Sequence, residues 1–175
     1  MALRHKDSDA QERRLAAYAP RVYGLLVRMV GNRDTAEDLT QETLLRAFRA
    51  FETYRSEGKF RAWIFRIARN AARDWFRRRP REPALGLDAD WPDAASPRPQ
   101  DRPEDRLLQG ERASKVEAAL QRLPAPDREV LLLRYYGELA FNDVAKITGE
   151  PLGTVLARAH RALKKMAELV PEEKT

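Results

Sequence analysis

The sequence predicts an all-α protein made of two small helical domains joined by a flexible linker. Apolar residues recur every three to four positions in each long segment, as they do along amphipathic helices. Six of the eleven prolines lie between residues 80 and 105, where no period is sustained. Near the C-terminus a short helix, a glycine turn and a longer helix follow one another, the pattern of a helix-turn-helix. We therefore place the domains at residues 1–80 and 106–175 and the linker at 81–105.

Composition excludes several classes of function. The 175 residues contain no cysteine and two histidines, His5 and His160. Disulfides, a thiolate nucleophile and cysteine zinc sites are therefore impossible, and a histidine-centred site is disfavoured. We expect no catalytic residue, no metal and no cofactor. No apolar run reaches the length of a membrane span and the first residues lack the apolar core of a signal peptide, so we expect a cytoplasmic protein without membrane insertion.

Residues 59–81, KFRAWIFRIARNAARDWFRRRPR, predict one long helix with two different faces. They contain nine basic residues and one acidic residue, and such a charge density favours a polyanionic partner. A solvated face is the alternative; the lone amide of Asn70 within the basic face favours a surface that contacts bases as well as phosphates. The apolar face is formed by Phe60, Trp63, Ile64, Ile67, Ala68, Ala71 and Trp75. The opposite face carries Arg66, Arg69, Asn70, Arg73 and Arg77.

Two further helices precede this one. The first is expected from about residue 9 to Val30, with a bend at Pro20 and an end at Gly31. Its buried stripe comprises Leu15, Tyr18, Val22, Leu25, Leu26, Met29 and Val30. The second is expected over 34–51, capped by Asn32 or Asp34. Its apolar side comprises Ala36, Leu39, Leu44, Ala47, Phe48 and Phe51, and its other side Asp34, Asp38, Gln41 and Glu42. That second set is either ordinary helix-start chemistry or, since it extends past the first turn, a binding surface.

The linker is acidic, with three arginines against seven carboxylates over residues 80–105 and hence a net charge of −4. Two interpretations stay open: a soluble spacer, or a tether that competes with DNA for the basic domains. Trp91 is unusual in such a segment, because a tryptophan in a loop normally packs against a surface.

The C-terminal part predicts four helices. The first runs over about 103–122 and buries Leu107, Leu108, Ala113, Val116, Ala119 and Leu120. The second is opened by Pro126 and ends before Gly137. The helix-turn-helix follows, with helices over 141–148 and from Pro151 to about Val170. The last helix buries Leu152, Val155, Ala159, Ala162, Leu163 and Met166. It carries Thr154, Arg158, Arg161 and Lys165 as a separate stripe, the side chains that a recognition helix offers to the major groove.

These motifs together resemble the extracytoplasmic-function group of bacterial sigma factors of the sigma-70 family. The matching stretches are AEDLTQE at 36–42, FRAWIFRIARNAARDWFRRR at 60–79, LPAPDREV at 123–130 and GTVLARAHRA at 153–162. The resemblance covers about residues 18–80 and 112–167. It implies a region 2 bundle of three or four helices, an acidic linker, and a four-helix region 4 domain with a helix-turn-helix.

The resemblance also implies the roles of the candidate residues. Asp38, Gln41 and Glu42 correspond to the surface that docks on the coiled coil of the largest subunit of core RNA polymerase, and region 4 to the part that meets the flap region. Asn70 corresponds to a position that captures an unstacked base of the -10 element, beside the 54–59 loop, while Arg66, Arg69, Arg73 and Arg77 hold the opening DNA. Thr154, Arg158, Arg161 and Lys165 are the candidates for -35 contact. An anti-sigma factor is a further expected partner.

The sequence departs from the family pattern in region 4. Leu156 and Ala157 stand where Lys-Ser is frequent, and Ala140 stands where a Ser or Thr commonly caps the preceding helix. A phosphate ligand and a cap are thereby lost, so DNA affinity of this domain is expected to be low. Alternative interpretations are a helix-turn-helix regulator that needs no polymerase, a nucleic-acid enzyme, and an adaptor that binds proteins alone. The Asp38, Gln41, Glu42 surface argues against the regulator, which does not need it. The lack of a metal-ligand cluster argues against the enzyme, and the arginine face argues against the adaptor.

Overall fold

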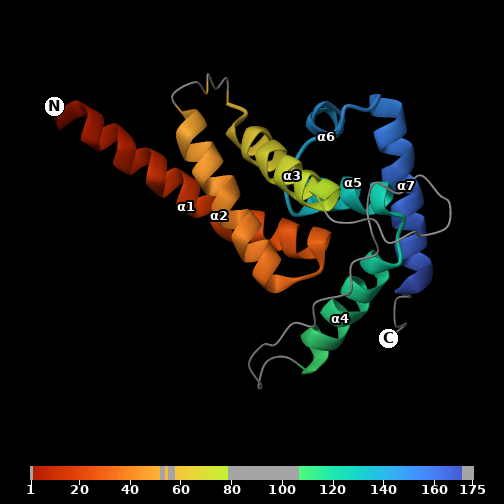
Figure 1. Cartoon of the computed structure of the whole chain (residues 1–175). Coiled ribbons are helices and arrows are strands. Elements are labelled where there is room, and N and C mark those ends of the chain that lie inside the picture. Colours follow the sequence, from red (N-terminus) through yellow and green to blue (C-terminus); the bar gives the residue numbers. More distant parts are fainter. Residues whose placement is uncertain (1, 52–53, 55–57, 79–106, 171–175) are drawn as a thin grey trace.

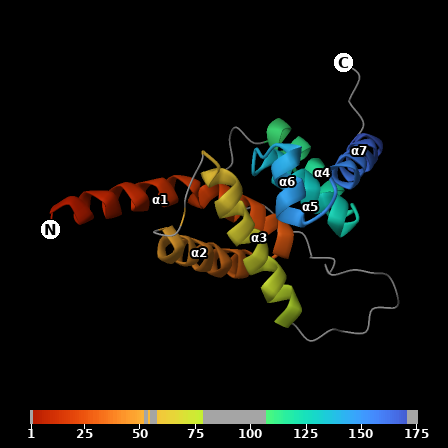
Figure 2. The same cartoon turned by 90° about the horizontal axis from the view of Figure 1, so that it is seen from above.

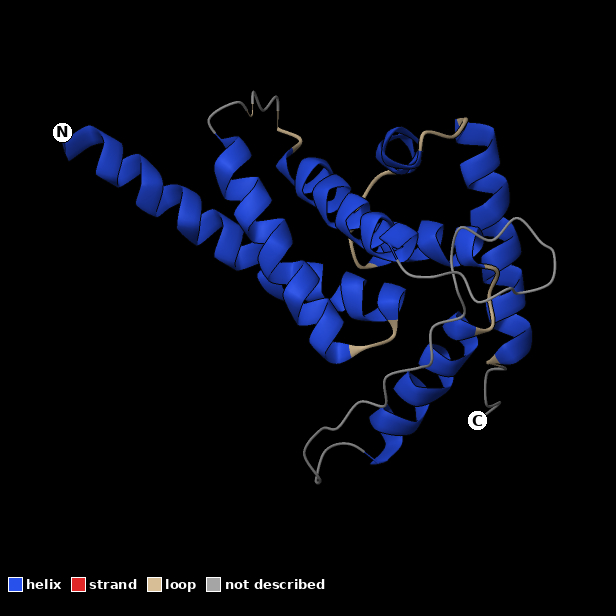
Figure 3. Cartoon of the chain, in the orientation of Figure 1, coloured by secondary structure: helices blue, strands red, loops and turns tan. Residues whose placement is uncertain are grey.

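All the regular structure in the described part of the chain is helical (Figure 3). A computed structural model describes residues 2–51, 54, 58–78 and 107–170. The predicted all-α class is confirmed. The linker at 81–105, including Trp91, lies outside the described residues, as do residues 55–57 of the loop before the basic helix. The exact domain boundaries stay predictions.

The first domain consists of α1 (Ala2–Val30), α2 (Arg33–Ala50) and α3 (Phe60–Arg78), each packed on the other two (Figure 1). α1 begins earlier than expected because residues 2–8 contain neither glycine nor proline. Pro20 lies inside α1, and Gly31 ends it with a φ of 72°, the left-handed conformation that glycine adopts without penalty. Asn32 caps α2, as predicted, because its side chain accepts a hydrogen bond of 2.8 Å from the Thr35 amide.

The core of this domain follows the predicted stripes with two corrections. The predicted stripe of α1 is buried, with Tyr18 half-buried. On α2, Phe48 was expected in the core but is 41% exposed, and Thr40 and Thr43 are buried with their hydroxyls donating to Ala36 and Leu39 carbonyls. On α3 the buried face is rotated from the prediction and adds Phe65, Ala72 and Phe76. The rotation arises because α3 is covered by α6 of the second domain as well as by α1 and α2.

The second domain consists of α4 (Leu107–Gln121), α5 (Ala125–Tyr135), α6 (Phe141–Thr148) and α7 (Leu152–Leu169). α7 packs on the other three, and α6 and α7 form the predicted helix-turn-helix. Gly149 makes its turn with a φ of 74°, and the Gly149 and Glu150 amides both donate to the Ala145 carbonyl. The core comprises Ala119, Leu120, Leu123, Val130, Leu131, Leu132, Leu133, Leu139, Val144, Ile147, Val155, Ala159 and Ala162.

Two predicted apolar faces of this domain are partly wrong. On α4, Ala113 and Val116 are exposed while Glu117 is buried, because Glu117 pairs with Arg28 of α1. On α7, Leu152 and Leu163 remain 39% and 44% exposed, because the contacts of α7 with α4, α5 and α6 cover only the narrower Val155–Ala159–Ala162 face.

The two domains pack directly against each other (Figure 2). α1 contacts α5, and α3 contacts α6. The long N-terminal part of α1 extends away from this junction in both views (Figures 1 and 2). The basic helix α3 therefore lies between the remainder of its own domain and the helix-turn-helix domain.

The α6 N-terminus provides a test of the local analysis. Ala140 is its N-cap in an extended conformation and makes no side-chain cap hydrogen bond. Replacing Ala140 with Ser should raise the free energy of unfolding of the helix-turn-helix domain by about 0.5–1 kcal/mol, because a hydroxyl would satisfy a free amide of the first turn. Urea denaturation followed by circular dichroism measures the change.

The matched control is Ala157→Ser, at an exposed position inside α7. Serine there should lower the free energy of unfolding by about 0.5 kcal/mol, because its helix propensity is below that of alanine. Equal effects of the two substitutions would contradict the capping argument.

Candidate nucleic-acid interface

Four of the five predicted residues of α3 form one exposed face. Arg66, Asn70, Arg73 and Arg77 are all exposed and follow the spacing i, i+4, i+7, i+11. This spacing places them within a stripe along one side of the helix. Three guanidinium groups beside an amide give a surface that can bind phosphates and offer hydrogen bonds to a base edge.

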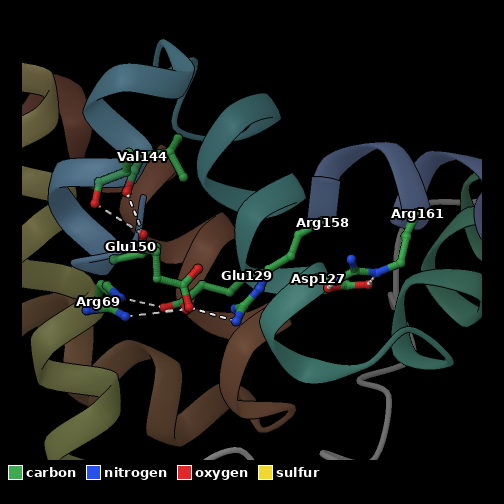
Figure 4. Close-up of polar contacts among 9 residues, drawn as sticks. Arg69, Asp127, Glu129, Val144, Glu150, Arg158 and Arg161 are labelled. Carbon is green, nitrogen blue, oxygen red and sulfur yellow. Dashed lines mark hydrogen bonds and ion pairs between the residues drawn. The ribbon is translucent and has the colours of Figure 1, made fainter. Parts of the chain in front are cut away.

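Arg69 lies apart from this stripe and is buried. Its side chain turns toward the second domain, where Nε lies 2.5 Å and Nη2 3.4 Å from the two carboxylate oxygens of Glu129 on α5 (Figure 4). Its Nη1 donates to the Ile147 carbonyl at the C-terminal end of α6, at 3.0 Å. In this conformation Arg69 cannot contact DNA, and this part of the predicted stripe must be corrected.

A chain of ion pairs joins the stripe to α2. Asp74 lies 3.0 Å from Arg77 and 3.6 Å from Arg46, and Arg46 also pairs with Glu42 at 2.5 Å. Glu42, a predicted polymerase-docking residue, is thus already engaged within the domain. Asp34, Asp38 and Gln41 are exposed on the same helix, as a docking surface requires.

The two tryptophans of the predicted apolar face, Trp63 and Trp75, both contact other aromatic side chains. Trp63 lies between Phe51, Tyr54 and Phe60, with its ring 4.4 Å from that of Tyr54. Trp75 packs edge-on against Phe76 at 4.8 Å. Both are half-buried, so the structure places them at the edge of the core rather than wholly inside it.

The basic stripe of α7 is also largely engaged in ion pairs. Arg158 pairs with Glu150 of the helix-turn-helix turn at 2.7 Å, and Lys165 pairs with Glu168 at 3.3 Å. Arg161 donates two hydrogen bonds, of 3.0 and 3.3 Å, to the buried carboxylate of Asp127 (Figure 4). Thr154 is exposed in the first turn of α7. The four predicted residues share one helix, and three of them pair with carboxylates of their own domain.

Sequence reasoning missed the carboxylates that hold these arginines. Asp127 and Glu129 lie in the first turns of α5, where acidic residues are expected for the helix dipole alone. Both are buried, at 6% and 8% exposure. One signal was available: Asp127, Arg128 and Glu129 directly precede a run of apolar residues, and charged groups that enter a core need partners.

Two negative findings apply to the residues that the structure describes. No helix among them is both long and apolar enough to cross a membrane. Among the same residues, no group of three or more histidine, aspartate or glutamate side chains is placed to hold a metal ion.

The fold and this surface define a two-domain helical protein with a basic helix in one domain and a helix-turn-helix in the other. The Sigma-70 region 2 family model matches residues 15–82, and the model of Sigma-70, region 4 matches residues 113–166. The chain therefore belongs to the sigma-70 family, in the group of the extracytoplasmic-function (ECF) RNA polymerase sigma factors.

Curated relatives agree with this assignment. The chain is 37% identical over 153 residues to the ECF RNA polymerase sigma factor SigE of Mycolicibacterium smegmatis, with 86% of the chain and 58% of that protein covered. It is 34% identical to the ECF RNA polymerase sigma-E factor of Haemophilus influenzae (89% and 85% covered). It is 32% identical to SigW of Bacillus subtilis (89% and 86% covered).

Solved structures show the same fold. The sigma factor RpoE of Bartonella quintana, solved with the anti-sigma factor NepR, is 26% identical with a TM-score of 0.71. That comparison covers 93% of this chain and 98% of the other. CnrH, solved with the cytosolic domain of CnrY, is 20% identical with a TM-score of 0.66, covering 95% and 90%.

The role of the α3 stripe can be tested at Asp74, the carboxylate within it. Asp74→Asn should tighten binding of single-stranded DNA roughly two- to fivefold, because Arg77 and Arg46 lose a competing anion and one more phosphate can be neutralised. Fluorescence anisotropy with a labelled oligonucleotide measures the affinity. Glu12→Gln, the same change of charge at an exposed site on α1, is the control. An equal gain in both variants would show that net charge, not the stripe, is responsible.

Proposed function

We propose that this chain directs core RNA polymerase to promoters. It would recognise a -10 and a -35 element and separate the two DNA strands. Membership of the sigma-70 family supports this function, because the relatives are RNA polymerase sigma factors. One observation carries the proposal: region 2 and region 4 occur in order on one chain, and the α3 of the first presents the exposed stripe of Arg66, Asn70, Arg73 and Arg77.

In this proposal α3 holds the opened strand. The three arginines bind the backbone, and the Asn70 amide binds a base that has left the stack. Asn70 lies between arginines on both sides along the helix, so a strand that follows the guanidinium groups brings its bases past the amide. Arg69 joins the stripe only after its contact with Glu129 is broken.

The -35 element is assigned to α7. Thr154 in its first turn suits a phosphate near a helix N-terminus, and Arg158, Arg161 and Lys165 provide the positive charge. Because these cations start from internal ion pairs and Leu156 and Ala157 add none, the affinity of this domain alone is expected to be low.

Asp38, Gln41 and Glu42 are proposed to bind the largest subunit of the polymerase. The protein is proposed to work in the cytoplasm, without enzymatic activity of its own and without a cofactor. An anti-sigma factor is a proposed regulator, because the sigma factor RpoE of Bartonella quintana, 26% identical to this chain, was solved in complex with the anti-sigma factor NepR.

The direct experiment mixes the purified chain with core RNA polymerase and a genomic DNA library and sequences the 5′ ends of the transcripts. Discrete start sites that share two upstream motifs at fixed spacing are expected. Binding of duplex DNA without specific initiation would overturn the proposal in favour of a polymerase-independent regulator.

The polymerase surface predicts a charge-sensitive contact. The double substitution Asp38→Arg and Gln41→Arg should abolish co-elution with core polymerase without unfolding the chain, because both side chains are exposed. The control, Glu12→Arg with Ala16→Arg, makes the same change of charge at exposed sites on α1. Unchanged co-elution of the α2 variant would count against the docking assignment.

The base-capture role predicts a selective defect. Asn70→Ala should lower the yield of open complexes at a matched promoter about tenfold while polymerase binding is unchanged, because a lost base contact costs roughly 1–3 kcal/mol. Permanganate footprinting measures the opening, and Asn142→Ala, exposed on α6, is the control. Equal yields for wild-type and Asn70→Ala would remove Asn70 from this role.

A further inference from the structure

Buried apolar residues of the two domains form one cluster, and polar contacts cross between the domains as well. At their centre the Arg69 guanidinium, 6% exposed, binds Glu129, 8% exposed, and the Ile147 carbonyl. A buried guanidinium satisfied in this way makes charge-assisted hydrogen bonds in a fork geometry. Arg69 and Glu129 belong to different domains, and the whole linker lies between their helices in the sequence.

A second contact lies between α1 and the second domain. Arg28 lies 4.2 Å above the ring of Tyr136, and its Nε is 2.9 Å from Glu117 on α4. Gln121 donates to the Arg28 carbonyl at 3.4 Å. Burial here raises the pKa of Tyr136, an effect that the nearby Arg28 charge opposes. One arginine of the first domain is thus held by an aromatic ring and a carboxylate of the second.

A third contact involves a residue in an uncommon backbone conformation. Glu138, in the turn between α5 and α6, has a φ of 48°, in the left-handed region that residues other than glycine rarely adopt. Its carboxylate lies 2.9 Å from Arg21 and 3.0 Å from Arg61, and its carbonyl accepts from Arg61 at 3.1 Å. Such outliers persist where the surrounding contacts hold them. The ion pairs and the carbonyl hydrogen bond of Glu138 are made with the other domain.

We infer that these three contacts form a latch that closes the free chain on itself and withholds part of its DNA surface. Glu129 occupies the position of a phosphate on Arg69, so the closed chain lacks one cation of the α3 stripe until a polyanion or another partner displaces the carboxylate. The inference rests on the proposed function for the meaning of that surface. The closed state itself does not depend on it.

The fraction of chains in which the latch is open sets the apparent DNA affinity. If only a fraction of chains is open, the apparent dissociation constant exceeds the intrinsic one by the inverse of that fraction. Removing the carboxylate of Glu129 should therefore tighten binding by more than the change of charge explains. Asp127→Asn offers a matched control for closure, because Asp127 is an equally buried carboxylate of the same helix whose partner, Arg161, lies in its own domain.

The closed state can be tested on the full chain without polymerase or DNA. The chain has no cysteine, so dyes can be placed at Glu37→Cys on α2 and Lys164→Cys on α7, both exposed. Single-molecule energy transfer should be high in the wild-type background and in Asp127→Asn. It should fall in Glu129→Arg, where two like charges meet, and recover when Arg69→Glu is added. Equal transfer in all four, or no recovery in the exchanged pair, would overturn the latch.

Glu138→Gly is a second variant that tests the latch even if Glu129→Arg unfolds its domain. Glycine relieves the positive φ, so the helix content measured by circular dichroism should be unchanged, while loss of the Arg21 and Arg61 contacts should still lower the energy transfer. Unchanged transfer in a folded Glu138→Gly chain would remove this contact from the latch.

Competition with DNA is tested with a short single-stranded dT oligomer. The oligomer should lower the energy transfer of the wild-type chain and should bind Glu129→Gln about tenfold more tightly. Adding Arg69→Gln should remove that gain. A Glu129→Gln affinity equal to wild-type would overturn the competition between Glu129 and DNA. Failure of the transcription experiment alone would overturn the proposed function and leave the closed state standing.

Discussion

The contact between Arg69 and Glu129 ties the basic helix to the helix-turn-helix domain. Burying a guanidinium and a carboxylate costs several kcal/mol of lost hydration for each ion, and mutual attraction offsets this only with good geometry and further hydrogen bonds. The structure provides both, through the two-point contact with Glu129 and the Ile147 carbonyl. The inferred latch requires that this junction opens and closes while each domain stays folded.

α3 illustrates how one helix meets three demands. Its Phe60, Ile64 and Ala68 side complete the first domain, its Arg69 edge faces the second, and its Arg66 and Asn70 side remains exposed. Because the helical period fixes which residues lie beside one another, residues only one or two positions apart in the sequence face different surroundings. The division between buried Arg69 and exposed Asn70 follows from this period and from the place where α6 packs.

Much of the fold could be predicted because it depends on local rules. The periodicity of apolar residues located the seven helices of the described residues, Gly31 and Gly149 marked ends that require a positive φ, and Asn32 marked a cap. The half-exposed Phe48, Leu152 and Leu163 were misplaced because periodicity identifies an apolar arc, but not how much of that arc a neighbour covers. The pairs Arg69 with Glu129 and Arg161 with Asp127 could not be predicted, because they join residues 60 and 34 positions apart and depend on tertiary packing.

The same pairs change how the basic residues should be understood. A free arginine gains the full attraction of a phosphate, whereas an arginine already bound to a carboxylate gains only the difference between two anions. On α7 this applies to Arg158 and Arg161, whose partners Glu150 and Asp127 belong to the same domain. Counting positive charges therefore overstates the DNA affinity. The position of each phosphate matters more, because a phosphate must fit where the carboxylate that it displaces was bound. In the proposed function, a protein built this way discriminates against loosely placed polyanions, and the exposed Arg66 and Asn70 contact the DNA before the paired arginines exchange.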